Sequence, residues 1–182
     1  KPFDFGAGQE GVLFPPEGHP AAVSAFFCNA AHQFGFWSLE GNRYGRPMVA
    51  QAGGVDRKGS DFVFYCTQRA LNGDPEYFRP EKLSAMNGRD MDRFFYDDHG
   101  RNPLPMWPER KNLCYAYAEW MATNRTTPEA LVVKANRARK PLRYFLDLLR
   151  EVPGYREDPL QKKAMLLALM LWFNDLIHTE VF

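Results

Sequence analysis

Apolar side chains recur with helical spacing along most of the chain. In "HPAAVSAFFCNAAHQFGFW" this spacing predicts a buried helix from about Pro20 to Trp37. The second half of the chain is almost wholly helical in pattern. Thr127 and Asp158 are each followed by a proline, an arrangement in which a capping side chain precedes the first helical position. We therefore expect the last helix to start at Asp158 and to run to about Leu176.

The first half of the chain mixes helical and turn-rich segments. The stretch "KGSDFVFYCTQRALNGDP" predicts a helix that begins at Ser60, whose hydroxyl can satisfy an N–H of the first turn, and stops at Asn72. Two short helices are expected in "RPEKLSAM" and "GRDMDRFFYDDHG". The turn-rich segment "SLEGNRYGRPMVAQAGG" leaves room for a two-stranded hairpin.

These elements predict a mainly α fold of seven or eight helices with a small β element near the N-terminus. We expect one domain over residues 1–182, with an arm, the aromatic helix and the β element in 1–57 and a helical bundle in 58–182. The chain starts without Met, so native residues absent at one or both ends are part of this expectation.

Two adjacent lysines stand at the start of the last helix. The ten residues "AMLLALMLWF" that follow carry no polar side chain and are expected to be buried all round. Lys162 and Lys163 lie where a helix end is already positive, so an anion is expected opposite them. That anion is either Glu157 or Asp158, or a bound phosphate or carboxylate. A desolvated lysine can also act as a nucleophile or base. The alternative is a pair of solvated lysines at a helix entrance.

Aromatic residues make up 15% of the chain and can form a slot for a flat ring as well as a core. The aromatic cluster after the first helix could sandwich a free or flipped base, while Asn29 and Gln33, four positions apart, could hydrogen-bond its edge. The alternative is an ordinary core helix with a structural histidine. The stacking candidates are His32, Phe34, Phe36 and Trp37.

Two further segments have both a structural interpretation and a ligand-binding one. Ser60, beside two basic residues at a helix start, could hold a phosphate through backbone N–H groups, although capping alone explains it. The segment "YDDHGR" could hold a metal, but no second ligand cluster supports this, and a polar helix end is expected. No cofactor and no metal are predicted.

Composition narrows the classes of partner. A net charge of +1 disfavours a polybasic nucleic-acid arm but allows a local basic patch. The three cysteines are far apart in apolar contexts, which indicates reduced core residues of an intracellular, cytoplasmic protein. No apolar stretch of about 20 residues is present, so no membrane span is expected. No signal peptide is visible.

Several segments carry a resemblance to known families. The stretch "VPGYREDPLQKKAMLLALML" resembles the hairpin and following helix of the superfamily that includes the archaeal 8-oxoguanine DNA glycosylases, and it is similar to the queuosine-salvage N-glycosidases. The stretch "AFFCNAAHQFGFW" is similar to the aromatic helix of the salvage family, and "KGSDFVFYCTQRAL" and "PERKNLCYAYAEWM" fit its order of segments. The resemblance implies a multi-helix, DNA-glycosylase-like bundle with a helix-hairpin-helix-like element whose N–H groups can meet a phosphate.

The resemblance also implies a reaction. Such enzymes cleave the bond between a purine-like base and C1′ of a ribose or deoxyribose, with an Asp carboxylate that stabilises the developing cation and, in the repair branch, a lysine that can attack C1′. Lys163, or else Lys162, matches that lysine. Asp175 is the only Asp after the lysines, with Glu180 nearby. It follows Lys163 by 12 residues, about 18 Å along an unbroken helix, so the two share a site only if the helix breaks near Asn174.

Three functions follow as hypotheses. The first is release of a modified, queuine-like guanine from a nucleotide or nucleoside. The second is a DNA base-excision glycosylase of the 8-oxoguanine type, with nucleic acid as its partner. The third is a helical binding module without catalysis. A basic patch for the second could come from Lys134, Arg137, Arg139, Lys140 and Arg143.

Overall fold

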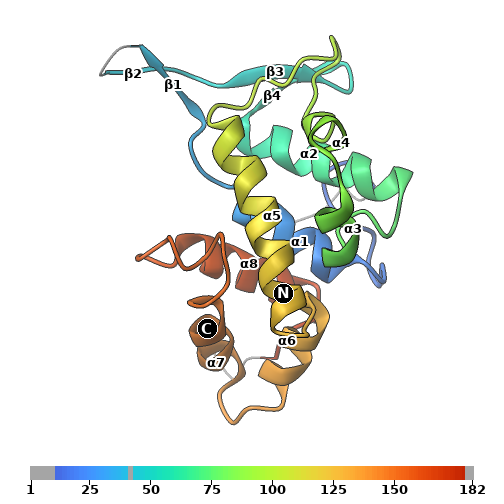
Figure 1. Ribbon diagram of the computed structural model, residues 1–182, viewed down its shortest axis with the longest axis vertical. Helices are drawn as coiled ribbons and strands as arrows, with labels where there is room; N and C mark the ends of the chain where they lie inside the picture. The colour runs from blue at the N-terminus through green and yellow to red at the C-terminus, as the bar shows by residue number, and fades with distance from the viewer. Residues whose placement is uncertain (1–10, 41–42, 179–182) are drawn as a thin grey trace.

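The computed structural model describes residues 11–40 and 43–178. Within them the chain is mainly α, with eight helices and four short strands (Figure 1), as the sequence pattern predicts. The helices are α1 (Ala22–Ala31), α2 (Gly59–Gly73), α3 (Pro80–Ala85), α4 (Gly88–Asp92), α5 (Trp107–Thr123), α6 (Pro128–Asn136), α7 (Pro141–Leu149) and α8 (Lys162–Phe173).

The strands form two antiparallel hairpins where the sequence predicted one. Strand β1 (Trp37–Glu40) pairs with β2 (Arg43–Pro47), and β3 (Val49–Ala52) pairs with β4 (Val55–Lys58). The second hairpin turns at Gly53 and Gly54, whose φ angles of +66° and +75° suit glycine in such a two-residue turn. Both hairpins lie at one end of the molecule (Figure 1).

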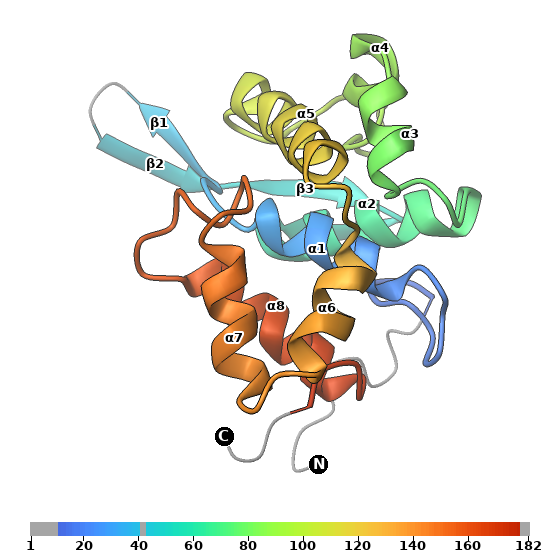
Figure 2. The same ribbon diagram turned by 60° about the horizontal axis from the view of Figure 1, so that its bottom comes forward.

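Helix α1 lies at the centre of the molecule, among α2, α5, α6 and α8 (Figure 2). All ten of its residues are buried, since eight of them are apolar and neighbouring elements pack on every side. Phe26 and Phe27 belong to a core cluster built with α5, α6, α7 and α8. Ala25 and Cys28 face a second cluster built with α2, β3 and the rings of residues 94 and 95. Helix α1 is thus shared by both clusters.

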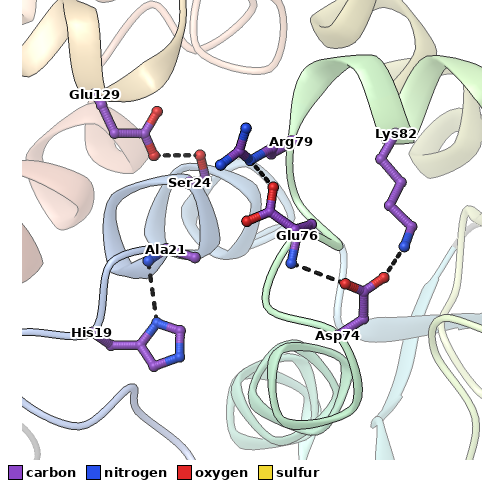
Figure 3. Close-up of polar contacts among 8 residues, drawn as sticks. All are labelled: His19, Ala21, Ser24, Asp74, Glu76, Arg79, Lys82 and Glu129. Atoms are coloured by element: carbon purple, nitrogen blue, oxygen red, sulfur yellow. Dashed lines mark hydrogen bonds and ion pairs between the residues drawn. The ribbon is translucent and has the colours of Figure 1, made fainter.

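Polar contacts tie α1 and α6 together at one end and order the segment that leads into α3 (Figure 3). The buried Ser24 hydroxyl of α1 donates to Glu129 Oε1 of α6 at 2.6 Å. Asp74, just after α2, accepts from the backbone N–H of Glu76 at 3.0 Å and pairs with the Lys82 ammonium of α3. The Asp74 contacts thus connect the segment after α2 to α3.

Two predicted helix starts have different outcomes. The Thr127 cap is confirmed, because its hydroxyl accepts from Ala130 N at 3.1 Å. The start at Asp158 is wrong by several residues, since α8 begins at Lys162. Asp158 still serves this helix end, because its carboxylate accepts from Lys163 N at 2.7 Å.

Three other expectations are corrected. Helix α1 ends at Ala31 rather than near Trp37. Helix α2 follows Lys58, and the Ser60 hydroxyl donates to Gln33 Oε1 at 2.8 Å instead of capping. The apolar run of α8 is not buried all round, since the Met165 side chain is 37% exposed. Among the residues described, no helix has both the length and the apolar character that crossing a bilayer requires.

Candidate functional site

A hollow of about 470 Å³ opens where the chain leaves α1, beside the first turns of α5 and α8. We call it the α8 hollow. It combines one aromatic ring, an amide, three carboxylates and two ammonium groups. Its lining residues are Gln33, Phe34, Glu109, Leu113, Glu157, Asp158, Lys162 and Lys163.

The two lysines of the α8 hollow differ in environment. The Lys162 side chain is exposed, whereas Lys163 is half-buried with its Nζ 5.0 Å from the centroid of the Phe34 ring. Burial lowers the pKa of the Lys163 ammonium from its ordinary value, and the charges of Asp158 and Glu157 oppose this shift. Lys163 is therefore the lysine whose amine combines partial desolvation with access to a cavity.

The hairpin before α8 contains a carboxylate, Glu157, that binds the backbone of the same hairpin. Gly154 adopts φ +93°, and its N–H donates to Glu157 Oε2 at 2.7 Å. Although partial burial works against it, hydrogen bonds from Arg156 and Gly154 lower the pKa of the Glu157 carboxyl. Asp158 likewise occupies the N-terminus of α8. Asp158 and Glu157 thus act on Lys163 through their charge, and the Gly154 N–H is already bound rather than open to a phosphate.

Gln33 is held in the wall of the hollow by two supporting side chains. Its Nε2 donates to Asn29 Oδ1 at 3.0 Å, and its Oε1 accepts from the Ser60 hydroxyl at 2.8 Å. Asn29 is itself buried, with its Nδ2 3.4 Å from Thr67 Oγ1. Asn29 and Ser60 therefore position Gln33. Of these three residues, Gln33 lines the α8 hollow.

Arg110 holds the segment that carries Phe34. Its side chain is fully buried and donates to the carbonyl oxygens of His32, Phe34 and Pro105. Its Cζ lies 4.2 Å from the centroid of the Phe34 ring. The sequence reasoning missed this residue. The signal was its position, since Arg110 stands four residues before the buried Cys114, on the inward stripe of α5.

The other aromatic candidates do not gather around a shared slot. His32 is fully buried with its Nε2 3.2 Å from Cys114 Sγ, and Trp37 is 51% exposed at the start of β1. The Phe36 ring packs on Gly59, where a Cβ atom would come within 2.4 Å of it. Of the proposed stacking residues, Phe34 lines the α8 hollow.

Asp175 lies away from the lysines. Helix α8 is unbroken from Lys162 to Phe173, and Asp175 follows its C-terminus, so Asp175 and Lys163 belong to opposite ends of one helix. Glu180 is outside the described residues. The carboxylates that share the hollow with Lys163 are Asp158, Glu157 and Glu109, of which Glu109 was not anticipated from sequence.

The two aspartates of the segment "YDDHGR" stabilise turns through hydrogen bonds from backbone N–H groups. Asp97 Oδ1 accepts from the backbone N–H groups of His99 and Arg101, both at 2.9 Å. The Asp98 carboxylate accepts from Gly54 N at 2.8 Å and Gly53 N at 2.9 Å, and these bonds lower its pKa. Both carboxylates thus have structural partners.

The chain was compared with models of known protein families and with curated proteins, and neither comparison gave a match. The resemblance to glycosylases and to queuosine-salvage proteins stays a prediction. The geometry of the α8 hollow is the basis on which a function can be argued.

Proposed function

We propose that the chain is an N-glycoside hydrolase that releases a modified, queuine-like guanine base from a nucleotide or nucleoside at the α8 hollow. The observation that carries the proposal is the half-buried Lys163 ammonium beside the Phe34 ring, in a cavity that also holds carboxylates. The volume of about 470 Å³ falls within the range of small-molecule sites, roughly 300–1,000 Å³.

The lining side chains suit the parts of a nucleotide. A flat base can stack on Phe34. Gln33 donates one N–H to Asn29 and accepts one hydrogen bond from Ser60. Its second N–H and one oxygen lone pair remain for the edge of the base. The exposed Lys162 ammonium at the first turn of α8 suits a 5′-phosphate, since the two groups carry opposite charge.

The chemistry requires an acid and a carboxylate. As the C1′–N bond breaks, its electron pair leaves with the base, and the Lys163 ammonium donates a proton to the departing nitrogen. The lowered pKa of Lys163 makes it a better proton donor at neutral pH than a solvated lysine. The Asp158 carboxylate stabilises the positive charge that develops on the sugar. Water then adds to C1′, and its proton passes to the exposed Glu109 carboxylate, which lines the same hollow.

A DNA glycosylase is the second candidate, and one observation favours it. The lowered pKa of Lys163 also suits a nucleophilic amine that attacks C1′ of a deoxyribose. Against it, the Gly154 N–H that a hairpin would offer to a DNA phosphate already binds Glu157. The net charge of +1 gives little general attraction to a duplex. Nucleotide hydrolysis is therefore the preferred function.

The test offers the purified chain queuosine 5′-phosphate, queuosine, guanosine 5′-phosphate and duplex DNA with 8-oxoguanine, and follows base release by chromatography. We expect release from the queuosine monophosphate and a fall in kcat/KM of about 100-fold or more in Lys163→Ala, because general acid catalysis contributes that much. Lys140→Ala, an exposed lysine at the start of α7, is the matched control and should retain full activity.

Two results would overturn the proposal. One is a folded chain that releases no base from any of the four substrates, which favours a binding module. The other is an active chain in which Lys163→Ala is as active as Lys140→Ala. Covalent trapping of the chain on 8-oxoguanine DNA by borohydride, lost in Lys163→Ala, would instead establish the DNA glycosylase.

A further inference from the structure

A second group of chemically competent side chains lies inside the protein and has no role in the proposed hydrolysis. Cys28 of α1 and His32, which directly follows this helix, stand four residues apart, and Cys114 faces them from α5. One ligand atom from each, two sulfurs and an imidazole nitrogen, lie within 4.8 Å of one another. The three side chains are 5%, 0% and 2% exposed. We call them the thiol cluster.

One feature beside the thiol cluster is unexplained by packing alone. The neighbouring Arg110 guanidinium is fully buried, and its hydrogen bonds go to carbonyl oxygens rather than to a carboxylate. A buried cation needs a compensating negative charge. The group that most opposes the effect of burial on Arg110 is the Cys114 sulfur.

We propose that Cys28, His32 and Cys114 form a buried binding site for Cu(I), held in a trigonal set of two thiolates and one imidazole. Thiolates are the soft ligands that select this ion. Two thiolates and one Cu(I) carry a single negative charge, and the buried Arg110 guanidinium balances it. Zn²⁺ would leave an uncompensated positive charge, and it prefers a fourth ligand that the cluster does not offer among the described residues.

The dimensions of the thiol cluster fit such an ion. Metal bonds to sulfur and nitrogen of about 2.0–2.3 Å in a trigonal plane separate the ligand atoms by about 3.5–4.0 Å. His32 Nε2 and Cys114 Sγ are 3.2 Å apart, and the widest separation in the cluster stays below 4.8 Å. These separations lie on either side of the required range, so we expect small side-chain rotations to close the set around the ion.

Uptake of the ion is a proton exchange. Both sulfurs bind as thiolates, so Cu(I) displaces the thiol protons, and any proton on the ligating imidazole nitrogen, to solvent. No oxidation or reduction takes place.

The test titrates the full-length chain with Cu(I) under oxygen-free, reducing conditions against a coloured chelator of known affinity. We expect one equivalent to bind, and Cys28→Ser and Cys114→Ser to weaken binding by more than about 100-fold, since even an outer partner of a ligand is worth about 10–100-fold. Cys66→Ser is the matched control. Its thiol is equally buried, but its sulfur contacts Tyr96 O and Arg69 and does not belong to the thiol cluster, so this variant should bind as the unsubstituted chain does.

A measurement on the unsubstituted chain keeps the test valid if a cysteine variant fails to fold. X-ray absorption at the copper edge should find two sulfur ligands and one nitrogen ligand. The proposal is overturned if the chain takes up no Cu(I), even when refolded in its presence, or if Cys66→Ser loses binding as fully as the cluster variants. Tighter binding of Zn²⁺ than of Cu(I), or a Cys28–Cys114 disulfide that excludes the ion under these conditions, would overturn it equally. None of these results depends on base release.

Discussion

Replacement of Gly154 by alanine tests the hairpin that leads into α8. Gly154 has φ +93°, a region that costs a residue with a Cβ atom roughly 1–2 kcal/mol. The added Cβ would also lie 3.2 Å from Ala31 Cβ and 3.3 Å from Leu113 Cδ2, which is tighter than ordinary contact. Overpacking of this kind adds about 1 kcal/mol or more. We therefore expect Gly154→Ala to lower the free energy of unfolding by about 2–3 kcal/mol.

The assay is urea unfolding followed by circular dichroism, with Gly88→Ala as the matched control. Gly88 opens α4 with an ordinary φ and has no atom within 4 Å of its potential Cβ. Alanine at position 88 should therefore leave stability unchanged or raise it by up to about 1 kcal/mol. Equal stability of the two variants would refute the reasoning, because it would mean that neither the backbone conformation nor the contact with α1 constrains the hairpin.

Three further predictions concern a cap, a close contact and a titration. Thr127→Ala removes the hydroxyl that accepts from the first turn of α6 and should cost about 1 kcal/mol in urea unfolding; no loss would mean that water replaces the cap. Gly59→Ala should destabilise by about 1–3 kcal/mol in thermal unfolding, because its Cβ would fall 2.4 Å from the Phe36 ring, and a stability gain would show that the ring moves freely. The folded pKa of Lys163 is lowered, so the unfolded state binds more protons between that pKa and 10.5, and stability rises with pH across this window. Lys163→Met should flatten the rise whereas Lys140→Met should retain it, and identical curves for the two variants would contradict the desolvation of Lys163.

The sequence pattern predicted a helix start correctly where a short-range capping interaction determines it. Thr127 and its proline define the start of α6 because the cap is a short-range interaction. The end of α1 was placed too late, since the apolar spacing continues through Phe34 and Phe36. The helix ends earlier because Arg110, more than seventy residues away, donates hydrogen bonds to the carbonyl oxygens of His32 and Phe34. That interaction has no local signal.

The candidate site was predicted in part for the same reason. Lys163, Asp158 and Gln33 all line one hollow, and the lysines were selected because two cations at a helix start require a partner. Asp175 was proposed from its order in the chain, yet an unbroken α8 separates it from the lysines. The thiol cluster was missed, because Cys114 meets His32 through packing across a separation of 82 residues.

The complete burial of α1 has a consequence for how the protein denatures. A helix with no solvent-facing side belongs to both core clusters at once, so neither cluster can melt while the other keeps its shape. If α7 and α8 unfolded, Phe26 and Phe27 would be exposed to solvent. If α2 unfolded, Ala25 and Cys28 would be exposed. The two halves of the core should therefore disappear in one cooperative step, with backbone amides of α1 among the slowest to exchange with deuterated water.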